Sequence, residues 1–273
     1  MKEYLVCVDS DGCAMDTMTI KHIRCFGPCI IKVWGLEEWE EAILSRWNEI
    51  NLYTRKRGIN RFQGLSVMLK EIDAAYRKVP GLQTFSKWVE ETTAFSESRL
   101  SEAIAAEEDN ECLKKALEWS QMVNTGIQEI PDSEKVAFSG VKEALKKTKE
   151  SADIAIVSSA NREAMEEEWV RCGLMEYVDH AMAQDVGTKQ KCIEKMIALG
   201  YGKGKILMIG DAQGDLNAAK GAGVSFFPIL AGKETESWKR FADEVLEEFT
   251  GGKYSREREG QEVALFMDNL KDV

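Results

Sequence analysis

The segment YLVCVDSDGC, residues 4–13, decides the fold class of this chain. Its first five residues are continuously apolar, which is typical of a strand that is covered on both faces in a parallel sheet. Asp9, Asp11 and Gly12 follow at once, so the strand ends in a polar turn. Open α/β sheets bind their ligands beyond the carboxyl ends of the strands. We therefore expect a ligand site directly after residue 8.

Later parts of the chain alternate between apolar runs and helical patterns. Apolar runs like the first lie at residues 154–157, 206–209 and 224–227. A weaker apolar run lies at residues 178–182. The helical patterns between them span residues 162–172, 189–199 and 216–222. This alternation predicts βαβ units and hence an α/β fold with a doubly wound, Rossmann-like parallel sheet. Two more amphipathic patterns, at 238–249 and 263–270, predict helices that cover the sheet.

Residues 17–131 interrupt this rhythm, because they contain no clear buried strand. Apolar side chains recur there at helical spacing over residues 36–50, 65–79 and 113–120. Five of the seven tryptophans lie in this block, and at such spacing they indicate core packing rather than ligand contacts. At 273 residues the chain is long enough for one core with a large insertion, or for two domains. We predict a core of residues 1–16 and 132–273 and an inserted all-α domain of residues 17–131.

Composition excludes several classes of protein. The net charge of −11 argues against a nucleic-acid surface, which requires clustered Lys and Arg. No apolar run approaches the roughly 20 residues of a membrane span, and the N-terminus does not resemble a secretory signal. The seven cysteines are scattered and odd in number, which favours free thiols. We expect a cytoplasmic protein without nucleic-acid or membrane partners.

One cysteine pair has two interpretations. Cys25 and Cys29, with His22 nearby, have the spacing of half a zinc site. The chain has no matching second half, and cysteine is commonly buried as a small apolar residue. We favour packing for the two cysteines, and likewise for His22.

Polar residues gather where the predicted strands end and the helices begin. They comprise Asp9, Asp11, Ser158, Ser159, Asn161, Lys189, Asp211 and Asp215. Carboxylates gathered at one sheet edge repel each other unless a cation lies among them, and hard oxygen ligands suit Mg²⁺. Lys189, the hydroxyl of Ser158 and backbone N–H groups near Gly12 and Asn161 would bind a tetrahedral anion, most simply phosphate. The pattern predicts a Mg²⁺-assisted phosphate site.

Asp9 and Asp11 have the relation that covalent phosphoryl transfer needs. A carboxylate can attack phosphorus when a metal offsets the repulsion and a neighbouring acid protonates the leaving oxygen. Alternate residues of an extended segment point to the same side, so both acids can reach one site. Gly12 then allows the chain to turn.

In this order, these residues resemble the haloacid dehalogenase superfamily. Its first motif, Asp-x-Asp-Gly after a buried strand, appears at residues 9–12, and its second, a strand ending in Ser or Thr, at 154–158. The lysine of the third motif resembles Lys189, and the Gly-Asp-x-x-x-Asp of the fourth resembles residues 210–215. The resemblance covers residues 1–16 and about 135–230. The chain departs from the first motif at Ser10, where an apolar residue is common, and at Cys13, where Thr is usual.

The resemblance implies a role for each matched residue. Asp9 would be the nucleophile and a metal ligand, and Asp11 the general acid and base, with its backbone carbonyl on the metal. Ser158 would bind the phosphoryl oxygens, Lys189 would offset their charge, and Asp211 and Asp215 would complete the Mg²⁺ site. We expect Gly12, Ser159 and Asn161 to contact the substrate.

The helical block has the position of the superfamily's C1 cap, the lid that selects the substrate. Within it, residues 60–64 form a polar, glycine-ended stretch that we predict to be a loop between two helices. Arg61 in this stretch would fork onto an anionic or hydroxylated substrate. The alternative is an ordinary helix connection without a role in binding.

Three functions fit these motifs. The leading one is a phosphatase that hydrolyses a small organic phosphomonoester, including a sugar phosphate, as a monomer or homodimer; the acid at residue 11 favours it. A phosphosugar mutase of the β-phosphoglucomutase type shares the same core groups. A non-catalytic phosphometabolite-binding module shares only the fold, and we disfavour it because all the expected groups are present.

Overall fold

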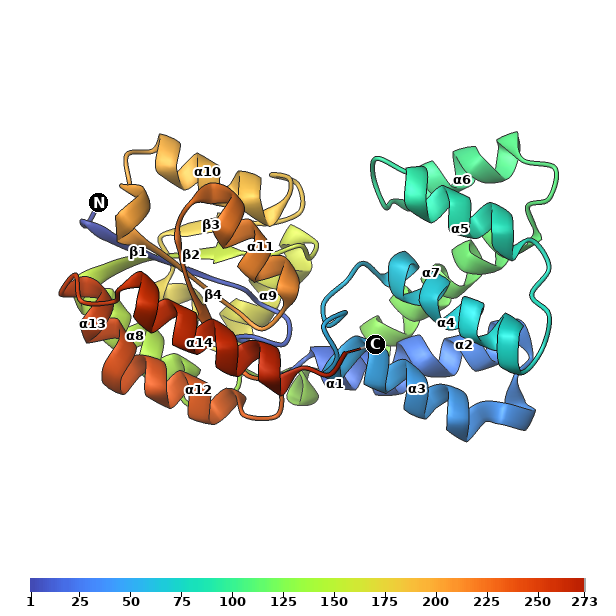
Figure 1. Ribbon diagram of the computed structural model, residues 1–273, viewed down its shortest axis with the longest axis horizontal. Helices are drawn as coiled ribbons and strands as arrows, with labels where there is room; N and C mark the ends of the chain where they lie inside the picture. The colour runs from blue at the N-terminus through green and yellow to red at the C-terminus, as the bar shows by residue number, and fades with distance from the viewer. Residues whose placement is uncertain (273) are drawn as a thin grey trace. The chain divides into compact units, whose positions relative to one another are not determined.

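The protein, described by a computed structural model over residues 1–272, divides into two compact units (Figure 1). One unit combines residues 1–18 with the chain from residue 132 onward, and the other comprises residues 19–131. We call them the core unit and the helical unit. The assignment of the helical unit as a cap domain remains a prediction.

The core unit is built on a five-stranded sheet in which every pairing is parallel. Its order is β3-β2-β1-β4-β5, so the chain leaves β1 in one direction and later returns to its other side. The strands are β1 (Tyr4–Val8), β2 (Ala152–Val157), β3 (His180–Met182), β4 (Ile206–Gly210) and β5 (Ser225–Pro228). The predicted doubly wound parallel sheet is confirmed.

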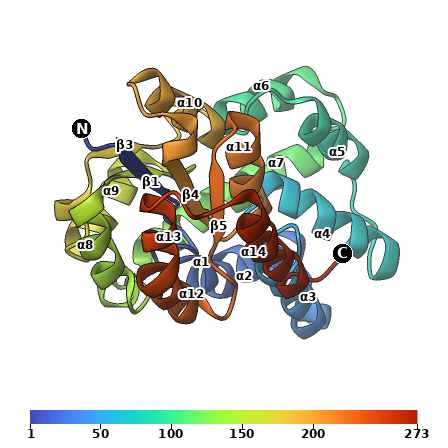
Figure 2. The ribbon, with the colours of Figure 1, turned by 60° about the vertical axis from the view of Figure 1, so that its left-hand side comes forward.

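Helices cover both faces of the sheet, which explains the uninterrupted apolar runs. The helices of the core unit are α8 (Val141–Ser151), α9 (Arg162–Arg171), α10 (Lys189–Ala198), α11 (Gln213–Ala222), α12 (Glu234–Arg240), α13 (Leu246–Thr250) and α14 (Arg256–Asn269). Val6 and Val8 of β1 pack in a cluster with side chains of α8, α9, α12 and α13. Leu5 and Cys7 pack on the other face with side chains of α10, α11 and α14. Figures 1 and 2 show α8, α12 and α13 on the side of the sheet opposite α10.

The C-terminal helices cover the sheet as predicted, and they also contact the edge strand β5. A π-helical turn (Phe241–Val245) joins α12 to α13, and α14 packs on β5 through Phe266. The side chains of Tyr254 and Glu259 hydrogen-bond to the backbone of Phe226 in β5. Tyr254 Oη donates to the carbonyl at 2.8 Å, and Glu259 Oε1 accepts from the N–H at 3.1 Å.

The helical unit has its own apolar core. It contains α1 (Met18–Lys21), a π-helical turn (His22–Phe26), α2 (Gly27–Trp34), a 3₁₀ turn (Glu37–Trp39), α3 (Glu40–Tyr53), α4 (Arg61–Ala75), α5 (Leu82–Glu91), α6 (Glu97–Ala106) and α7 (Glu111–Glu129). Trp47 and Trp119 are fully buried, and their ring centroids lie 6.1 Å apart. His22 stacks on Phe26 at 4.6 Å, so it is a packed histidine, as predicted. The tryptophans of this block therefore build the core.

The predicted loop at residues 60–64 is wrong, because α4 begins at Arg61. Asn60 caps the helix by accepting from the N–H of Phe62 at 2.9 Å, and Gln63 Oε1 accepts from the N–H of Asn60. These two bonds form a capping box, which starts a helix. Gly64 lies inside α4, where a Cβ atom would come within 2.6 Å of Asn51 Oδ1 on α3. The glycine therefore permits close helix packing and does not mark a turn.

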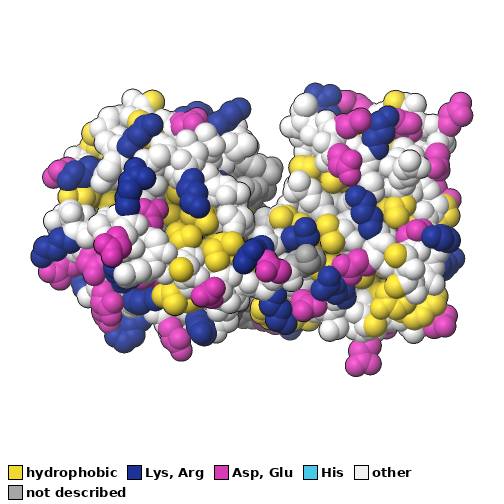
Figure 3. Space-filling view, in the orientation of Figure 1, with side chains coloured by type: hydrophobic (Ala, Val, Ile, Leu, Met, Phe, Trp, Pro, Cys, Tyr) yellow, Lys and Arg dark blue, Asp and Glu magenta, His cyan; other side chains and the backbone are white. Residues whose placement is uncertain are grey.

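Charges of both signs are interspersed on the face shown in Figure 3, where lysines and arginines alternate with acids. All seven cysteines are free, as predicted; six are buried and Cys172 is partly exposed. Across residues 1–272, every helix is too short or too polar to cross a bilayer.

Candidate active site

The candidate site lies at the carboxyl ends of β1 and β4, where the strand order reverses. Asp9 directly follows β1, and its N–H donates to the carbonyl of Ile209 in β4 at 3.0 Å. Asp211 directly follows β4, and Asp215 lies in the first turn of α11. Such a switch point is where doubly wound sheets bind ligands. Neighbouring strands thus bring together acids from positions about 200 residues apart in the chain.

Three carboxylates form a cluster at this point. Each of Asp9, Asp211 and Asp215 offers one oxygen, and these oxygens lie within 4.8 Å of one another. Asp211 and Asp215 are fully buried, and Asp9 is 5% exposed. The ammonium group of Lys189, the first residue of α10, lies 2.9 Å from Asp9 Oδ1 and 2.6 Å from Asp215 Oδ1. One lysine cannot balance three buried carboxylates, so the cluster has the charge and the oxygen donors that suit a divalent cation.

Burial and charge shift the pKa values of these groups in a consistent way. Burial raises the pKa of Asp9 well above its ordinary value, and the neighbouring Asp215 and Asp211 raise it further, against the opposing effect of Lys189. Burial alone would lower the pKa of Lys189, but Asp215 and Asp9 outweigh it and raise that pKa. Lys189 is therefore a permanent cation beside Asp9.

Asp11 lies in the same turn but is not part of the carboxylate cluster. Its Oδ1 accepts a hydrogen bond of 2.5 Å from Thr17 Oγ1, and Thr17 is fully buried. Gly12 has a φ of 79°, a left-handed conformation that favours glycine. The chain can therefore reverse directly after Asp11, as the sequence predicted. Thr17 fixes one oxygen of the carboxyl that we predict to act as the acid.

Ser158, Ser159 and Asn161 lie together after β2. Ser158 is buried, its N–H donates to Met182 O at 2.9 Å, and its Oγ accepts from the N–H of Ala160 at 3.1 Å. Ser159 and Asn161 are exposed. Asn161 caps α9 by accepting from the N–H of Ala164 at 3.2 Å. Its side chain thus has a structural task, and its role with substrate remains a prediction.

Arg61 belongs to the helical unit, where its guanidinium is held by neighbours. Nη1 donates to Asn124 Oδ1 at 2.7 Å and to Ser120 Oγ at 3.3 Å, and the group lies 5.1 Å from the ring centroid of Phe26. Burial lowers the pKa of Arg61, with Glu97 acting in the opposite direction. Its contact with substrate remains a prediction.

Residues that the sequence did not single out also contact the turn after β1. Thr17 is one, and the others are Trp169, which donates to Ser10 Oγ, and Trp238, which donates to the carbonyl of Cys13. No local pattern marks these tryptophans, because each lies more than 150 residues from its partner. Burial raises the pKa of the Cys13 thiol, and Asp211 and Asp9 raise it further, so Cys13 is an unreactive thiol.

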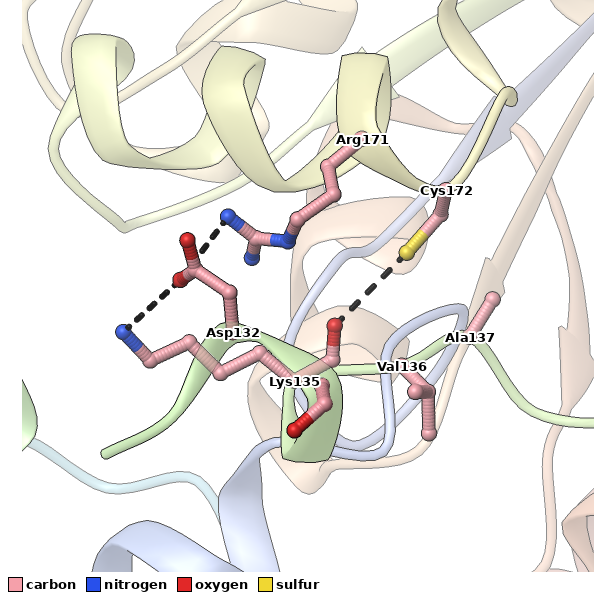
Figure 4. Close-up of a pocket in the computed structure, with 7 residues that line it drawn as sticks. Asp132, Lys135, Val136, Ala137, Arg171 and Cys172 are labelled. Atoms are coloured by element: carbon pink, nitrogen blue, oxygen red, sulfur yellow. Dashed lines mark hydrogen bonds and ion pairs between the residues drawn. The ribbon is translucent and has the colours of Figure 1, made fainter.

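A separate cavity of about 420 Å³ in the core unit is lined by seven residues, which include Asp132, Arg171 and Cys172 (Figure 4). Asp132 forms ion pairs with two cations that line the cavity, with Arg171 at 3.1 Å and with Lys135 at 3.6 Å. Cys172 Sγ lies 3.7 Å from the carbonyl of Lys135. None of the predicted site residues lines this cavity, so it is not the candidate site.

Two solved structures with similar folds are distant from this chain in sequence. A protein assigned provisionally as a phosphoglycolate phosphatase, from Lactobacillus delbrueckii subsp. bulgaricus, is 14% identical over 93% of this chain and 99% of its own, with a TM-score of 0.52. A provisional phosphatase from Clostridium difficile is 17% identical over 85% of this chain and 86% of its own, with a TM-score of 0.50. At these identities the likeness shows the fold alone. No curated protein sequence matches the chain.

A family model places the chain more firmly. The model of haloacid dehalogenase-like hydrolases matches residues 78–229, which is more than half of the 273 residues. The match includes Ser158, Lys189, Asp211 and Asp215, and it begins after the turn that carries Asp9. Lys189, Asp211 and Asp215 lie beside Asp9, and Ser158 directly follows β2, the strand paired with β1. The chain belongs to the haloacid dehalogenase-like hydrolase family.

Proposed function

We propose that the protein is a Mg²⁺-dependent phosphatase that hydrolyses a small organic phosphomonoester through a phospho-aspartyl intermediate on Asp9. The observation that carries the proposal is the buried cluster of Asp9, Asp211 and Asp215 with Lys189 beside it. Family membership supports a hydrolase. The acid at residue 11 supports a phosphate ester as the substrate, because it can protonate the leaving oxygen.

Asp9, Asp211 and Asp215 would hold Mg²⁺, together with the backbone carbonyl of Asp11. The ion supplies positive charge that lets an anionic nucleophile approach an anionic phosphoryl group. Lys189 adds a fixed positive charge 2.9 Å from Asp9. The fit rests on the donor set, since the clustered carboxylate oxygens carry more negative charge than one lysine offsets.

In the first half of the reaction, a carboxylate oxygen of Asp9 attacks phosphorus and the ester P–O bond breaks. Asp11 gives its proton to the leaving oxygen, which departs as an alcohol. In the second half, Asp11 takes a proton from water, the water oxygen attacks phosphorus, and the acyl phosphate bond breaks. Inorganic phosphate leaves, and Asp9 returns as a free carboxylate.

Ser158 and Lys189 would bind the phosphoryl oxygens during both halves. The Ser158 hydroxyl accepts from the N–H of Ala160, and this leaves its own proton to donate to a phosphoryl oxygen. Gly12, Ser159 and Asn161 would contribute further contacts with the substrate. Arg61 would bind an anionic or hydroxylated part of the ester. Its Nη1 donates to Asn124, and its Nη2 would donate to the substrate.

The test is Mg²⁺-dependent release of phosphate from p-nitrophenyl phosphate and from a panel of phosphorylated metabolites, which should include phosphoglycolate and hexose phosphates. Wild-type protein should turn over with Mg²⁺ and stop in excess EDTA, and Asp9→Asn should be inactive. Asp73→Asn is the matched control, since Asp73 lies in the helical unit and pairs with Lys78 at 2.8 Å. It should retain wild-type activity.

Two other outcomes would contradict the phosphatase. Transfer of the phosphoryl group between hydroxyls of a hexose phosphate, without release of phosphate, would identify a mutase. Binding of phosphate esters without any turnover across the panel would identify a binding module.

A further inference from the structure

The turn that follows β1 is a compact unit of backbone hydrogen bonds. The carbonyl of Ser10 accepts from the N–H groups of Ala14 at 3.0 Å and Met15 at 2.8 Å. The N–H of Gly12 donates to the carbonyl of Met15 at 2.9 Å. This turn, residues 9–15, carries both Asp9 and Asp11, so its placement on the sheet sets the positions of nucleophile and acid together. We call it the nucleophile turn.

Two buried indoles attach the nucleophile turn to helices on one face of the sheet. Trp169, on α9, donates from Nε1 to Ser10 Oγ at 2.9 Å. Trp238, on α12, donates from Nε1 to the carbonyl of Cys13 at 2.9 Å. Both side chains are fully buried. A buried indole N–H needs a partner, and here both partners belong to the same short turn.

The two bonds flank the acid. Ser10 lies between Asp9 and Asp11, and Cys13 follows Gly12, so one bond holds each side of the reversal at Gly12. Ser10 and Cys13 are also the two positions at which this chain departs from the family's first motif. The hydroxyl of Ser10 has a specific task here, since an apolar side chain could not accept from Trp169. The carbonyl of Cys13 is the acceptor for Trp238, so that bond does not depend on the thiol.

The second bond comes from outside the part of the chain that the family model matches. That match ends at residue 229, and Trp238 lies in α12, the first of the C-terminal helices. Trp238 also packs edge-on against Phe241, with ring centroids 5.8 Å apart, and Phe241 packs against Phe227 of β5. A rigid, buried aromatic group on the sheet thus holds the donor in place.

We propose that Trp169 and Trp238 are positioning residues that hold the nucleophile turn in its reactive geometry, and that α12 is thereby required for catalysis. The inference rests on the proposed phosphatase function. Reactive groups must be held closely, since a displacement of about 1 Å can lower a rate roughly 100-fold. Each indole acts through the turn and touches no reacting atom.

The first experiment removes one N–H at a time and keeps the aromatic ring. Trp169→Phe and Trp238→Phe should each lower kcat for p-nitrophenyl phosphate roughly tenfold, with KM within about twofold of wild type, because binding groups remain while alignment is lost. Tyr254→Phe is the matched control. It also deletes a donor to a backbone carbonyl, 2.8 Å from Phe226, and it lies in the same C-terminal segment but not on the turn.

A double-mutant cycle separates positioning from general stability. Ser10→Ala removes the acceptor of Trp169 and is a small change that should fold. If Trp169 acts through Ser10, Trp169→Phe should lower kcat much less in the Ser10→Ala background than in wild type. Equal losses in the two backgrounds would show that Trp169 acts in another way and would overturn its assignment.

A readout without activity distinguishes failure of this inference from failure of the proposed function. Amide hydrogen exchange of residues 9–16 should be faster in the two tryptophan variants than in Tyr254→Phe and wild type. If wild type hydrolyses no phosphate ester, the phosphatase is refuted, and faster exchange would still support the anchoring. Unchanged exchange and unchanged kcat in both tryptophan variants, or equal loss of kcat in Tyr254→Phe, would refute the inference.

Discussion

Replacing Asp9 by Asn should make the metal-free protein more stable while abolishing its activity. At an effective dielectric constant of about 20, two unit charges 4.8 Å apart repel by about 3.5 kcal/mol. Because 4.8 Å is the upper limit of these separations, Asp9 meets at least about 7 kcal/mol of repulsion from Asp211 and Asp215, against about 6 kcal/mol of attraction from Lys189 at 2.9 Å. The net repulsion is at least about 1 kcal/mol, and burial of the charge adds to it. We expect Asp9→Asn to raise the unfolding free energy by about 1–3 kcal/mol at pH 8.

The gain should depend on pH in a defined direction. The folded-state pKa of Asp9 lies above the unfolded value of about 3.9. Wild type therefore loses stability as the pH rises from the unfolded pKa to the folded-state pKa of Asp9. Asp9→Asn has no such loss, so its advantage should be larger at pH 8 than at pH 5. Urea unfolding in EDTA at both values measures it, and saturating Mg²⁺ should reverse the order by stabilising wild type more.

Asp73→Asn should change the unfolding free energy in the opposite direction. The side-chain bond from Lys78 lowers the pKa of Asp73, so Asp73 stabilises the fold above its unfolded pKa and loses this effect as the pH falls. This substitution should therefore destabilise the protein at pH 8. If metal-free Asp9→Asn were less stable than wild type at pH 8, Asp9 would not carry net repulsion in the folded protein.

Three further substitutions test the remaining groups of the site. Lys189→Met should lower the metal-free unfolding free energy by about 3–5 kcal/mol, measured in urea, because it leaves buried carboxylates uncompensated; an unchanged value would contradict the ion pairs. Thr17→Val should lower kcat roughly tenfold with little change in KM, because Asp11 loses the donor that orients it; unaltered steady-state kinetics would exclude that task. Asp211→Asn should abolish the rise in melting temperature that Mg²⁺ gives wild type, and a wild-type rise would remove Asp211 from the metal site.

Most of the core could be predicted from the sequence because its signals are local. A buried parallel strand is apolar throughout, and the residue after it lies at the edge of the sheet that binds ligands. Asp9 and Asp211 are therefore candidate site residues by their positions alone. Their mutual distance then follows from the pairing of β1 with β4. The helices of the C-terminal segment were equally visible in their apolar spacing.

The parts that were missed depend on contacts between distant segments or on a signal that was read wrongly. Trp169 and Trp238 contact the nucleophile turn only in the folded chain, so no spacing reveals them. Thr17 lies near Asp11 in sequence, but its hydroxyl reaches the acid only because the chain reverses at Gly12. At residues 60–64 the pattern Asn-x-x-Gln indicates a helix start, whereas Gly64, which suggests the end of a loop, lies inside the helix.

The hydrogen bonds from Tyr254 and Glu259 to Phe226 have a consequence for self-association. β5 forms one edge of the sheet, and an edge with unpaired backbone groups invites another strand to add to it. Here the outward N–H and carbonyl of Phe226 are already engaged, and α14 packs along the same strand. A second copy could not extend the sheet at this residue without first displacing both side chains, so these two bonds oppose strand addition at Phe226.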